Sequence, residues 1–284
     1  MIIDASLYLL ASFVLGTIIG SFANVFVLRY GTGRSLGGRS SCGSCGKTLS
    51  WYELIPVVSW LIQWGRCRSC ESRISPQYLI AELVFGFVFM AAAYTVFSGA
   101  SCQLPAASFV SLYPCILELI YLWLVSFLFI SLSIYDIKHM IIPDGMLVAL
   151  GIVVVVWNIV LPVVGYQLPG SSHPDILMSL ISGPLVALPF FALWFVSKGR
   201  WMGLGDIKLA VVIGWMLGLL GGFSALVFGV WAGALISLLI VGITRLVSHR
   251  AGLTMKSEIP FGPFLAAGAL FVLLTGSTIL DLIL

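Results

Sequence analysis

Residues 199–220 read GRWMGLGDIKLAVVIGWMLGLL. The stretch starts with a basic residue and glycines, places a carboxylate at Asp206, and continues after Lys208 as an unbroken apolar run. An apolar run bounded in this way is typical of a helix that enters lipid, because charged groups are costly inside the bilayer core. The stretch therefore predicts a membrane-spanning helix with an aspartate at its threshold.

The rest of the chain has the same apolar character. Of its 284 residues, 60% are hydrophobic and only 9% are charged, and the mean hydropathy is +1.12. A soluble protein of this length needs more charge to cover its surface. Runs of the length that a helix needs to cross a bilayer recur at 5–28, 78–97, 114–134, 141–162, 176–196, 206–220, 223–243 and 261–282. We therefore predict an all-α polytopic membrane protein with about eight transmembrane helices.

The basic residues indicate the orientation of these helices. All 14 Lys and Arg residues fall in four alternate loops, 29–77, 135–140, 197–208 and 244–260. The positive-inside rule places these loops in the cytoplasm and both termini outside. The first apolar run has no basic residue before it, so we expect a retained span and no cleaved signal. The net charge of +3 reflects this topology and gives no indication of nucleic-acid binding.

The first cytoplasmic loop carries two C-x-x-C pairs, in Cys42-Gly-Ser-Cys45 and Cys67-Arg-Ser-Cys70. Four thiolates in two tight turns suit tetrahedral zinc, and a site closed by four cysteines is structural. We expect glycines at 43 and 46 to let the backbone curl around the metal. A redox dithiol or plain free cysteines are the alternatives, and a reducing cytosol argues against two disulfides. The predicted organisation is a first span over 1–28, a zinc-binding loop over 29–77 and a seven-span domain over 78–284.

Two further cysteines, Cys102 and Cys115, lie on or near the outer side. They could form a disulfide there, where the compartment permits one. Alternatively, Cys115 is simply a small apolar residue at the head of the third span. The sequence leaves both possibilities open.

Two aspartates lie at the inner edge of the membrane in the same tripeptide, Asp136-Ile-Lys138 and Asp206-Ile-Lys208. Two carboxylates brought together in a partly desolvated place share one proton, because both cannot ionise freely. Such a pair can split an amide: the ionised partner draws a proton from water and the protonated partner donates to the carbonyl oxygen. We therefore predict an aspartate dyad formed by Asp136 and Asp206.

The same residues have simpler interpretations. Asp206 and Asp144 each stand where a residue could cap a helix, and Lys138 and Lys208 could extend toward lipid headgroups. Two other functions are possible. One is a transporter with inner-edge aspartates, and the other is a noncatalytic assembly protein that docks a partner through its zinc loop.

The chain resembles the prepilin leader peptidases, membrane aspartic proteases of the G-x-G-D type. The resemblance lies in GSFANVFVLR at 20–29, in the cysteine loop at 42–86, in YDIKHMIIPD at 135–144 and in GLGDIKLA at 203–210. It implies that Asp136 and Asp206 are the catalytic pair, that Gly203 and Gly205 let the backbone approach the substrate, and that the four cysteines bind structural zinc. Asp144 and Glu82 match acidic positions of the family with a supporting role.

The resemblance also implies a substrate and a second activity. Members cleave the short basic leader of type IV prepilins and type II secretion pseudopilins after a glycine, at the cytoplasmic face of the bacterial inner membrane. Many bacterial members then methylate the new N-terminus with S-adenosylmethionine. The residues themselves contain no soluble-type motif for this cofactor, so a peptidase without methyltransferase activity is the alternative.

Overall fold

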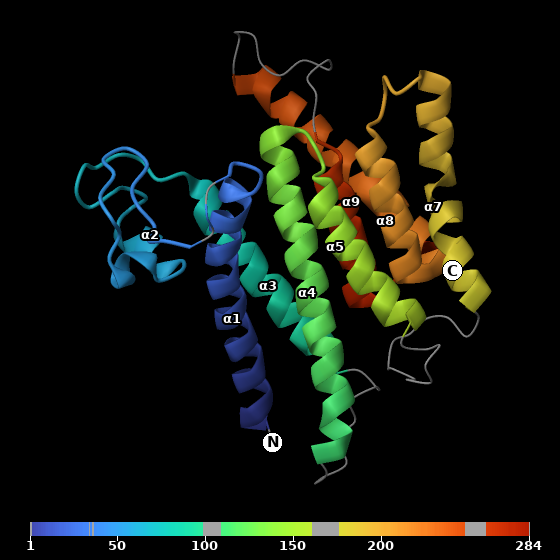
Figure 1. The fold of residues 1–284 in the computed structure, drawn as a ribbon, viewed down its shortest axis with the longest axis horizontal. Coiled ribbons are helices and arrows are strands. Elements are labelled where there is room, and N and C mark those ends of the chain that lie inside the picture. Colours follow the sequence, from blue (N-terminus) through green and yellow to red (C-terminus); the bar gives the residue numbers. More distant parts are fainter. Residues whose placement is uncertain are drawn as a thin grey trace. The chain divides into compact units, whose positions relative to one another are not determined.

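Figure 1 shows the computed structural model of the chain, which describes residues 2–33, 35, 37–98, 109–160, 176–247 and 260–283. The long helices are α1 (Ile2–Arg29), α3 (Pro76–Ser98), α4 (Phe109–His139), α5 (Asp144–Val155), α7 (Ile176–Ser197), α8 (Leu204–Val247) and α9 (Gly262–Thr275). Short turns of helix are η1 (Trp51–Leu54), α2 (Val58–Ile62), η3 (Val156–Val160) and α10 (Ile279–Ile283). The described ranges contain no β-strand, only two isolated β-bridges, which confirms an all-α fold.

Five of these helices, α1, α3, α4, α7 and α8, are long and apolar enough to cross a membrane. Their outer faces expose large apolar side chains such as Leu7, Phe195 and Leu235, which suits contact with lipid. Each predicted apolar run coincides with helix in the described residues, with α5 and α9 shorter than the runs that contain them. The polytopic membrane class is therefore confirmed, while the count of eight spans stays a prediction.

Helix α8 joins two of the predicted spans and bends between them. The predicted runs 206–220 and 223–243 leave a hinge at Gly221-Gly222, but the interruption of helical backbone within α8 is at Gly218, with φ 73° and ψ −173°. That conformation is open to glycine and closed to residues with a Cβ. Gly222 instead lies where a Cβ would come within 2.8 Å of Val186 Cγ2, so its role is close packing against α7.

The chain divides into two compact units, Met1–Phe127 and Leu128–Leu284. In the first unit α1 packs along α3 with almost no space between the backbones. A Cβ at Gly16 would lie 2.5 Å from the Phe85 carbonyl oxygen, and one at Gly20 would lie 2.9 Å from Glu82 Cα. Small residues bring membrane helices together in this way, because van der Waals contact replaces the missing hydrophobic driving force.

In the second unit α8 lies between α7 and α9 and contacts α5 (Figure 1). The same close approach recurs here: a Cβ at Gly214 would lie 2.7 Å from the Ser182 carbonyl oxygen, and one at Gly229 would lie 2.8 Å from that of Phe264. The Ser182 hydroxyl also donates to the Gly214 carbonyl at 2.9 Å. This packing fixes the first residues of α8, which carry Asp206.

Candidate active site and metal centre

Asp136 lies in the last turn of α4 and is only 4% exposed. Its carboxylate accepts a hydrogen bond from the backbone N–H of Gly262, the first residue of α9. A Cβ at Gly262 would lie 2.6 Å from Asp136 Oδ2, so only glycine leaves room for the carboxylate. The start of α9 therefore acts as an anion-binding helix N-terminus for Asp136.

Asp206 is the third residue of α8 and is half-buried. Its carboxylate accepts a hydrogen bond from the backbone N–H of Gly203, the residue before the helix. This is the returning half of a capping box, in which a side chain in the first turn satisfies the N-cap amide. The capping alternative is therefore partly right: Asp206 is not the N-cap residue, yet it caps the N-terminus of α8.

The two aspartates belong to one site within the second unit. The charge of Asp136 acts electrostatically on Asp206. Ile142 separates the helix starts that hold them: it would contact a Cβ at Gly205 at 2.9 Å and one at Gly262 at 3.3 Å. The predicted pair of inner-edge carboxylates is therefore brought together by the N-termini of α8 and α9 and the last turn of α4.

Asp144 and Lys208 form an ion pair beside this site. Lys208 Nζ lies 2.6 Å from Asp144 Oδ1, and both side chains are exposed. Asp144 is the first residue of α5 and Pro143 is its N-cap, so the proposed capping role of Asp144 is wrong. The proposal that Lys208 only extends toward headgroups is likewise wrong, because its ammonium pairs with a carboxylate.

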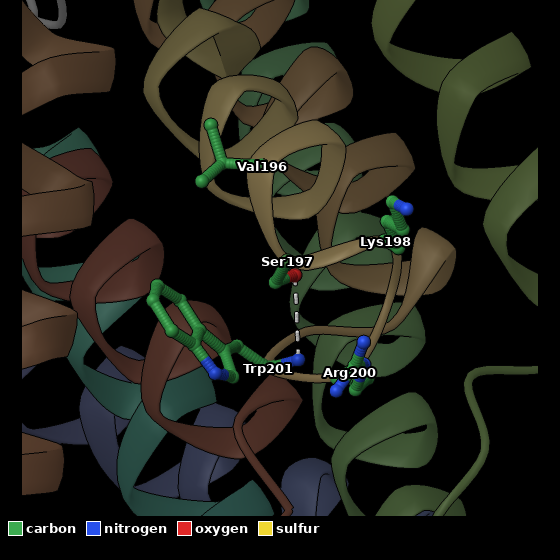
Figure 2. A pocket seen from close by; sticks show the side chains of 5 residues that line it. All are labelled: Val196, Ser197, Lys198, Arg200 and Trp201. Carbon is green, nitrogen blue, oxygen red and sulfur yellow. Dashed lines mark hydrogen bonds between the residues drawn. The ribbon is translucent and has the colours of Figure 1, made fainter.

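The turn that leads into Asp206 encloses a small pocket of about 230 Å³, lined by Val196, Ser197, Lys198, Arg200 and Trp201. Figure 2 shows Lys198 and Arg200 on one side of this turn and Val196 and Trp201 on the other. The backbone N–H of Trp201 donates to the Ser197 hydroxyl at 3.4 Å. Basic and aromatic residues together are typical of a membrane–water interface, so this turn supports a position of Asp206 at the membrane edge.

Two further residues were predicted to support the site, Lys138 and Glu82. Lys138 is exposed in the last turn of α4. Glu82 belongs to the first unit, is 7% exposed, and accepts a hydrogen bond from the Val57 N–H at 2.7 Å. Glu82 therefore holds the loop between α1 and α3.

The four cysteines of that loop form one cluster. The sulfur atoms of Cys42, Cys45, Cys67 and Cys70 all lie within 4.8 Å of one another, and those of Cys42 and Cys70 are 3.8 Å apart. An ideal tetrahedron with zinc–sulfur bonds of about 2.3 Å has edges of about 3.8 Å. The donor set and its spacing therefore fit a four-coordinate metal.

Both cysteine pairs use the same backbone turn. The Cys42 N–H donates to the Lys47 carbonyl and the Cys67 N–H donates to the Ser72 carbonyl, each at 2.9 Å. The fifth residue of each turn has positive φ, 72° at Gly46 and 54° at Glu71. Gly46 therefore plays the predicted role, whereas Gly43 is outside the set of residues with positive φ and its predicted role is wrong.

The turn also prepares a cysteine for metal binding. The backbone N–H groups of Cys45 and Ser44, followed by the Ser72 hydroxyl, lower the pKa of the Cys42 thiol to about 6. A thiolate is the form that ligates a metal. The neighbouring Cys70 and Cys42 groups raise the pKa of the Cys45 thiol to about 11, so Cys42 is the one of these two thiols that ionises first.

Cys115 is disulfide-bonded, which settles the open alternative for this residue, and Cys102 lies outside the described residues.

Sequence reasoning missed Gly262 and Ile142. A signal for Gly262 existed: Gly262-Pro263 opens the last apolar run at the same membrane edge as the aspartates, where proline in a first turn marks a helix start.

Comparisons with known proteins agree with this architecture. Residues 14–96 match the bacterial peptidase A24 N-terminal domain, and residues 122–240 match the type IV leader peptidase family. No solved structure matches the chain.

Three of the relatives are each known as a prepilin leader peptidase/N-methyltransferase. The protein from Bacillus subtilis is 32% identical over 277 residues, which cover 95% of each chain. The protein from Myxococcus xanthus is 30% identical and matches 84% of this chain and 64% of its own length. The protein from Vibrio cholerae is 27% identical, with coverage of 74% of this chain and 78% of its own length. The chain therefore belongs to the type IV leader peptidase family.

Proposed function

We propose that the protein is a membrane aspartic peptidase in which Asp136 and Asp206 are the catalytic pair. The observation that carries this proposal is the meeting of two carboxylates at the ends of α4 and α8, each held by a backbone N–H. Preorganised carboxylates of this kind need no movement before reaction. Asp136 is buried and Asp206 is half-buried, so we propose that water reaches the pair from the side of Asp206.

The pair hydrolyses an amide by general acid–base catalysis. One carboxylate removes a proton from a water molecule, whose oxygen attacks the scissile carbonyl carbon, while the protonated partner donates to the carbonyl oxygen. Collapse of the tetrahedral species breaks the C–N bond: the carboxyl that took the proton from water delivers it to the leaving nitrogen, and the proton on the former carbonyl oxygen returns to the partner carboxylate. Gly205 is packed against Ile142, whereas a Cβ at the exposed Gly203 would lie 3.7 Å from its nearest neighbour, Asp206 Oδ2. We therefore propose that Gly203 is the position at which an extended substrate can approach Asp206.

The substrates follow from the family and from the site's position. The curated relatives are described as prepilin leader peptidases, and we propose that this chain cleaves prepilins or pseudopilins after the glycine that ends their basic leader. The apolar helix of such a substrate partitions into the bilayer beside the spans. The scissile bond then lies at the membrane edge, at the depth proposed for the aspartates.

We further propose that the site faces the cytoplasm of a bacterial inner membrane and that both termini lie outside. The support is the distribution of Lys and Arg, all 14 of which fall in alternate loops. The cysteine loop then occupies a reducing compartment, where thiols persist and zinc is the fitting metal. Cys42, Cys45, Cys67 and Cys70 would hold the zinc, which would tie the two turns together and supply no chemistry to cleavage.

Methylation of the new N-terminus with S-adenosylmethionine is the second proposed activity. Its support is that the relatives are named as N-methyltransferases. The pocket at the α7–α8 turn has about 230 Å³, below the roughly 300–1,000 Å³ typical of small-molecule sites. We therefore assign no residues to the methyl donor.

The test uses the purified full-length protein in liposomes with a synthetic prepilin and S-adenosylmethionine. Mass spectrometry of the products reads the new N-terminus and any added methyl group. The proposal expects cleavage directly after the leader glycine and a product one methyl group heavier than the cleaved peptide. Cleavage elsewhere would contradict the proposed specificity. A cleaved but unmethylated product would contradict the methyltransferase activity and support a peptidase without it.

A further inference from the structure

The loop that carries the cysteine cluster exposes an apolar surface. Large apolar side chains between residues 51 and 64 point outward, with Trp64 87%, Trp51 75% and Ile62 64% exposed. We call this surface the aromatic face; it consists of Trp51, Tyr52, Leu54, Ile55, Val58, Leu61, Ile62 and Trp64. Exposed apolar side chains gathered in one folded loop are typical of a binding site.

The exposure of these side chains follows from an ordered local fold. The Glu53 carboxylate is buried and accepts a hydrogen bond from the Ser50 N–H at 2.8 Å, which closes a capping box around η1. The Trp60 ring lies against Gly65, where a Cβ would come within 2.7 Å of Cζ2. Glu53 and Gly65 are thus buried within the segment. The backbone conformation that buries them leaves the aromatic face exposed.

The depth of the segment beside α3 indicates what covers the aromatic face. The Val57 N–H, in the middle of the segment, donates to Glu82 Oε2 at 2.7 Å. Glu82 is six residues inside a helix that begins at Pro76, which is about 9 Å along the axis. α3 has 23 residues and is therefore about 35 Å long, against a hydrocarbon core of about 30 Å.

Glu82 consequently lies several ångströms below the level at which α3 enters the lipid. The neighbouring helix agrees in direction: Gly20, which packs against Glu82, is nine residues from the end of α1 at Arg29, which is about 14 Å along the axis. The hydrogen bond therefore draws residues 55–58 of the loop down to the membrane interface. The exposed side chains on either side of Val57 then meet headgroups and the first acyl carbons.

The charges around the aromatic face favour the same occupant. Four basic residues flank it, Lys47, Arg66, Arg68 and Arg73, whereas the acidic residues of the described loop are Glu71 and the buried Glu53. The Arg68 guanidinium carbon lies 5.4 Å from the centre of the Tyr52 ring, which places a cation beside the apolar surface. Tryptophan together with basic residues is the composition of segments that bind an anionic membrane surface.

We propose that the aromatic face docks the metal loop on the lipid bilayer, in contact with anionic headgroups and the upper acyl chains. The loop is then a membrane-bound layer beside α1 and α3, clamped by the hydrogen bond from Val57 to Glu82. A second protein is the competing occupant. The flanking arginines would repel a cationic peptide segment. Because Val57 is held at the level of the membrane interface, lipid is the molecule nearest to the exposed side chains of the aromatic face.

The test measures which quencher reaches Trp51 and Trp64 in the full-length, zinc-loaded protein. The protein is reconstituted in phosphatidylcholine liposomes with or without phosphatidylglycerol. The emission of the Trp51→Phe/Trp64→Phe variant is subtracted from that of the wild type, which isolates the two tryptophans. We expect phospholipids brominated near the carbonyl end of the acyl chain to remove most of this difference emission, and aqueous acrylamide to remove little.

Trp60→Phe is the matched control, because the Trp60 ring covers Gly65 within the same loop. Its difference emission should respond weakly to the brominated lipid. Bound zinc is measured for every variant, and equal zinc content shows that the loop is folded. The Phe substitutions keep the apolar character, so the variant loop still docks.

Two outcomes would overturn the proposal. In the first, acrylamide removes the difference emission of Trp51 and Trp64 while brominated lipid leaves it intact. In the second, acrylamide reaches the two residues in lipid alone, and a prepilin peptide then protects them, which would make the aromatic face a protein-binding surface. Stronger lipid quenching with phosphatidylglycerol than without it would support the role of the flanking arginines.

Discussion

The backbone N–H of Gly262 donates a hydrogen bond to the carboxylate of Asp136, so the first residue of α9 holds the last turn of α4. The dipole of α9 adds a favourable interaction with a carboxylate at this point. No side chain fits between them, because a Cβ at residue 262 would lie 2.6 Å from Oδ2. The proposed catalytic aspartate therefore depends on a glycine far away in the sequence.

Gly262→Ala should displace the Asp136 carboxylate and impair cleavage. A shift of about 1 Å in a catalytic group can reduce the rate about 100-fold, and we expect a loss of this order in kcat with the protein still folded. Prepilin cleavage by the reconstituted variant measures it. Gly242→Ala is the control, because a Cβ there meets nothing within 4 Å; equal rates for the two variants would contradict the account of Gly262.

Asp144→Asn should leave cleavage almost unchanged. The Asp144–Lys208 pair is exposed on both sides, and exposed ion pairs contribute about 0.2–1 kcal/mol. Thermal unfolding in detergent should show a small loss that disappears at high salt, because salt screens such pairs. A loss of cleavage as large as that of the Gly262→Ala variant would assign Asp144 to the catalytic machinery.

Cys42→Ser should remove the metal from the loop and spare the chemistry of cleavage. A structural zinc site contributes roughly 10–16 kcal/mol to the folding of its turns, so the loop should become sensitive to protease. Zinc content and limited proteolysis check this, with Ser69→Ala as a variant of the same loop that retains all four thiols. A fully folded Cys42→Ser protein that cannot cleave would contradict the structural role.

The two cysteine turns predict opposite effects of a pair of matched substitutions. Gly46→Ala places a Cβ at φ 72°, which costs about 1–2 kcal/mol and should weaken zinc affinity about 5–30-fold. Glu71→Gly relieves a side chain held at φ 54° and should leave the affinity equal or slightly tighter. Competition with a chelator measures both. Weaker binding by the Glu71→Gly variant would contradict the equivalence of the turns.

The sequence predicted those parts of the site that depend on local pattern. The spacing of Cys42, Cys45, Cys67 and Cys70 identified a four-thiol cluster, because each pair fixes one turn. The repeated Asp-Ile-Lys tripeptide and the distribution of basic residues placed Asp136 and Asp206 at one membrane edge. These features are encoded over a few residues, so no tertiary contact was needed to find them.

The contacts that complete the site come from packing between distant segments. Gly262 and Ile142 matter because α9 and the loop after α4 meet at the start of α8, and apolar runs do not reveal which helices are neighbours. The bend of α8 at Gly218 has the same origin. Several glycines in this helix could bend it, and contacts such as that of Gly222 with Val186 decide which of them remain helical.

The central claim is that Asp136 and Asp206 together hydrolyse the prepilin leader bond. The most direct test is prepilin cleavage in liposomes by Asp136→Asn, Asp206→Asn and, as the matched control, Asp144→Asn. Asparagine keeps the shape of each side chain and removes its ability to exchange a proton. The account predicts that the first two variants remain folded and fail to cleave, while Asp144→Asn cleaves nearly as the wild type does. Normal cleavage by either Asp136→Asn or Asp206→Asn would contradict it.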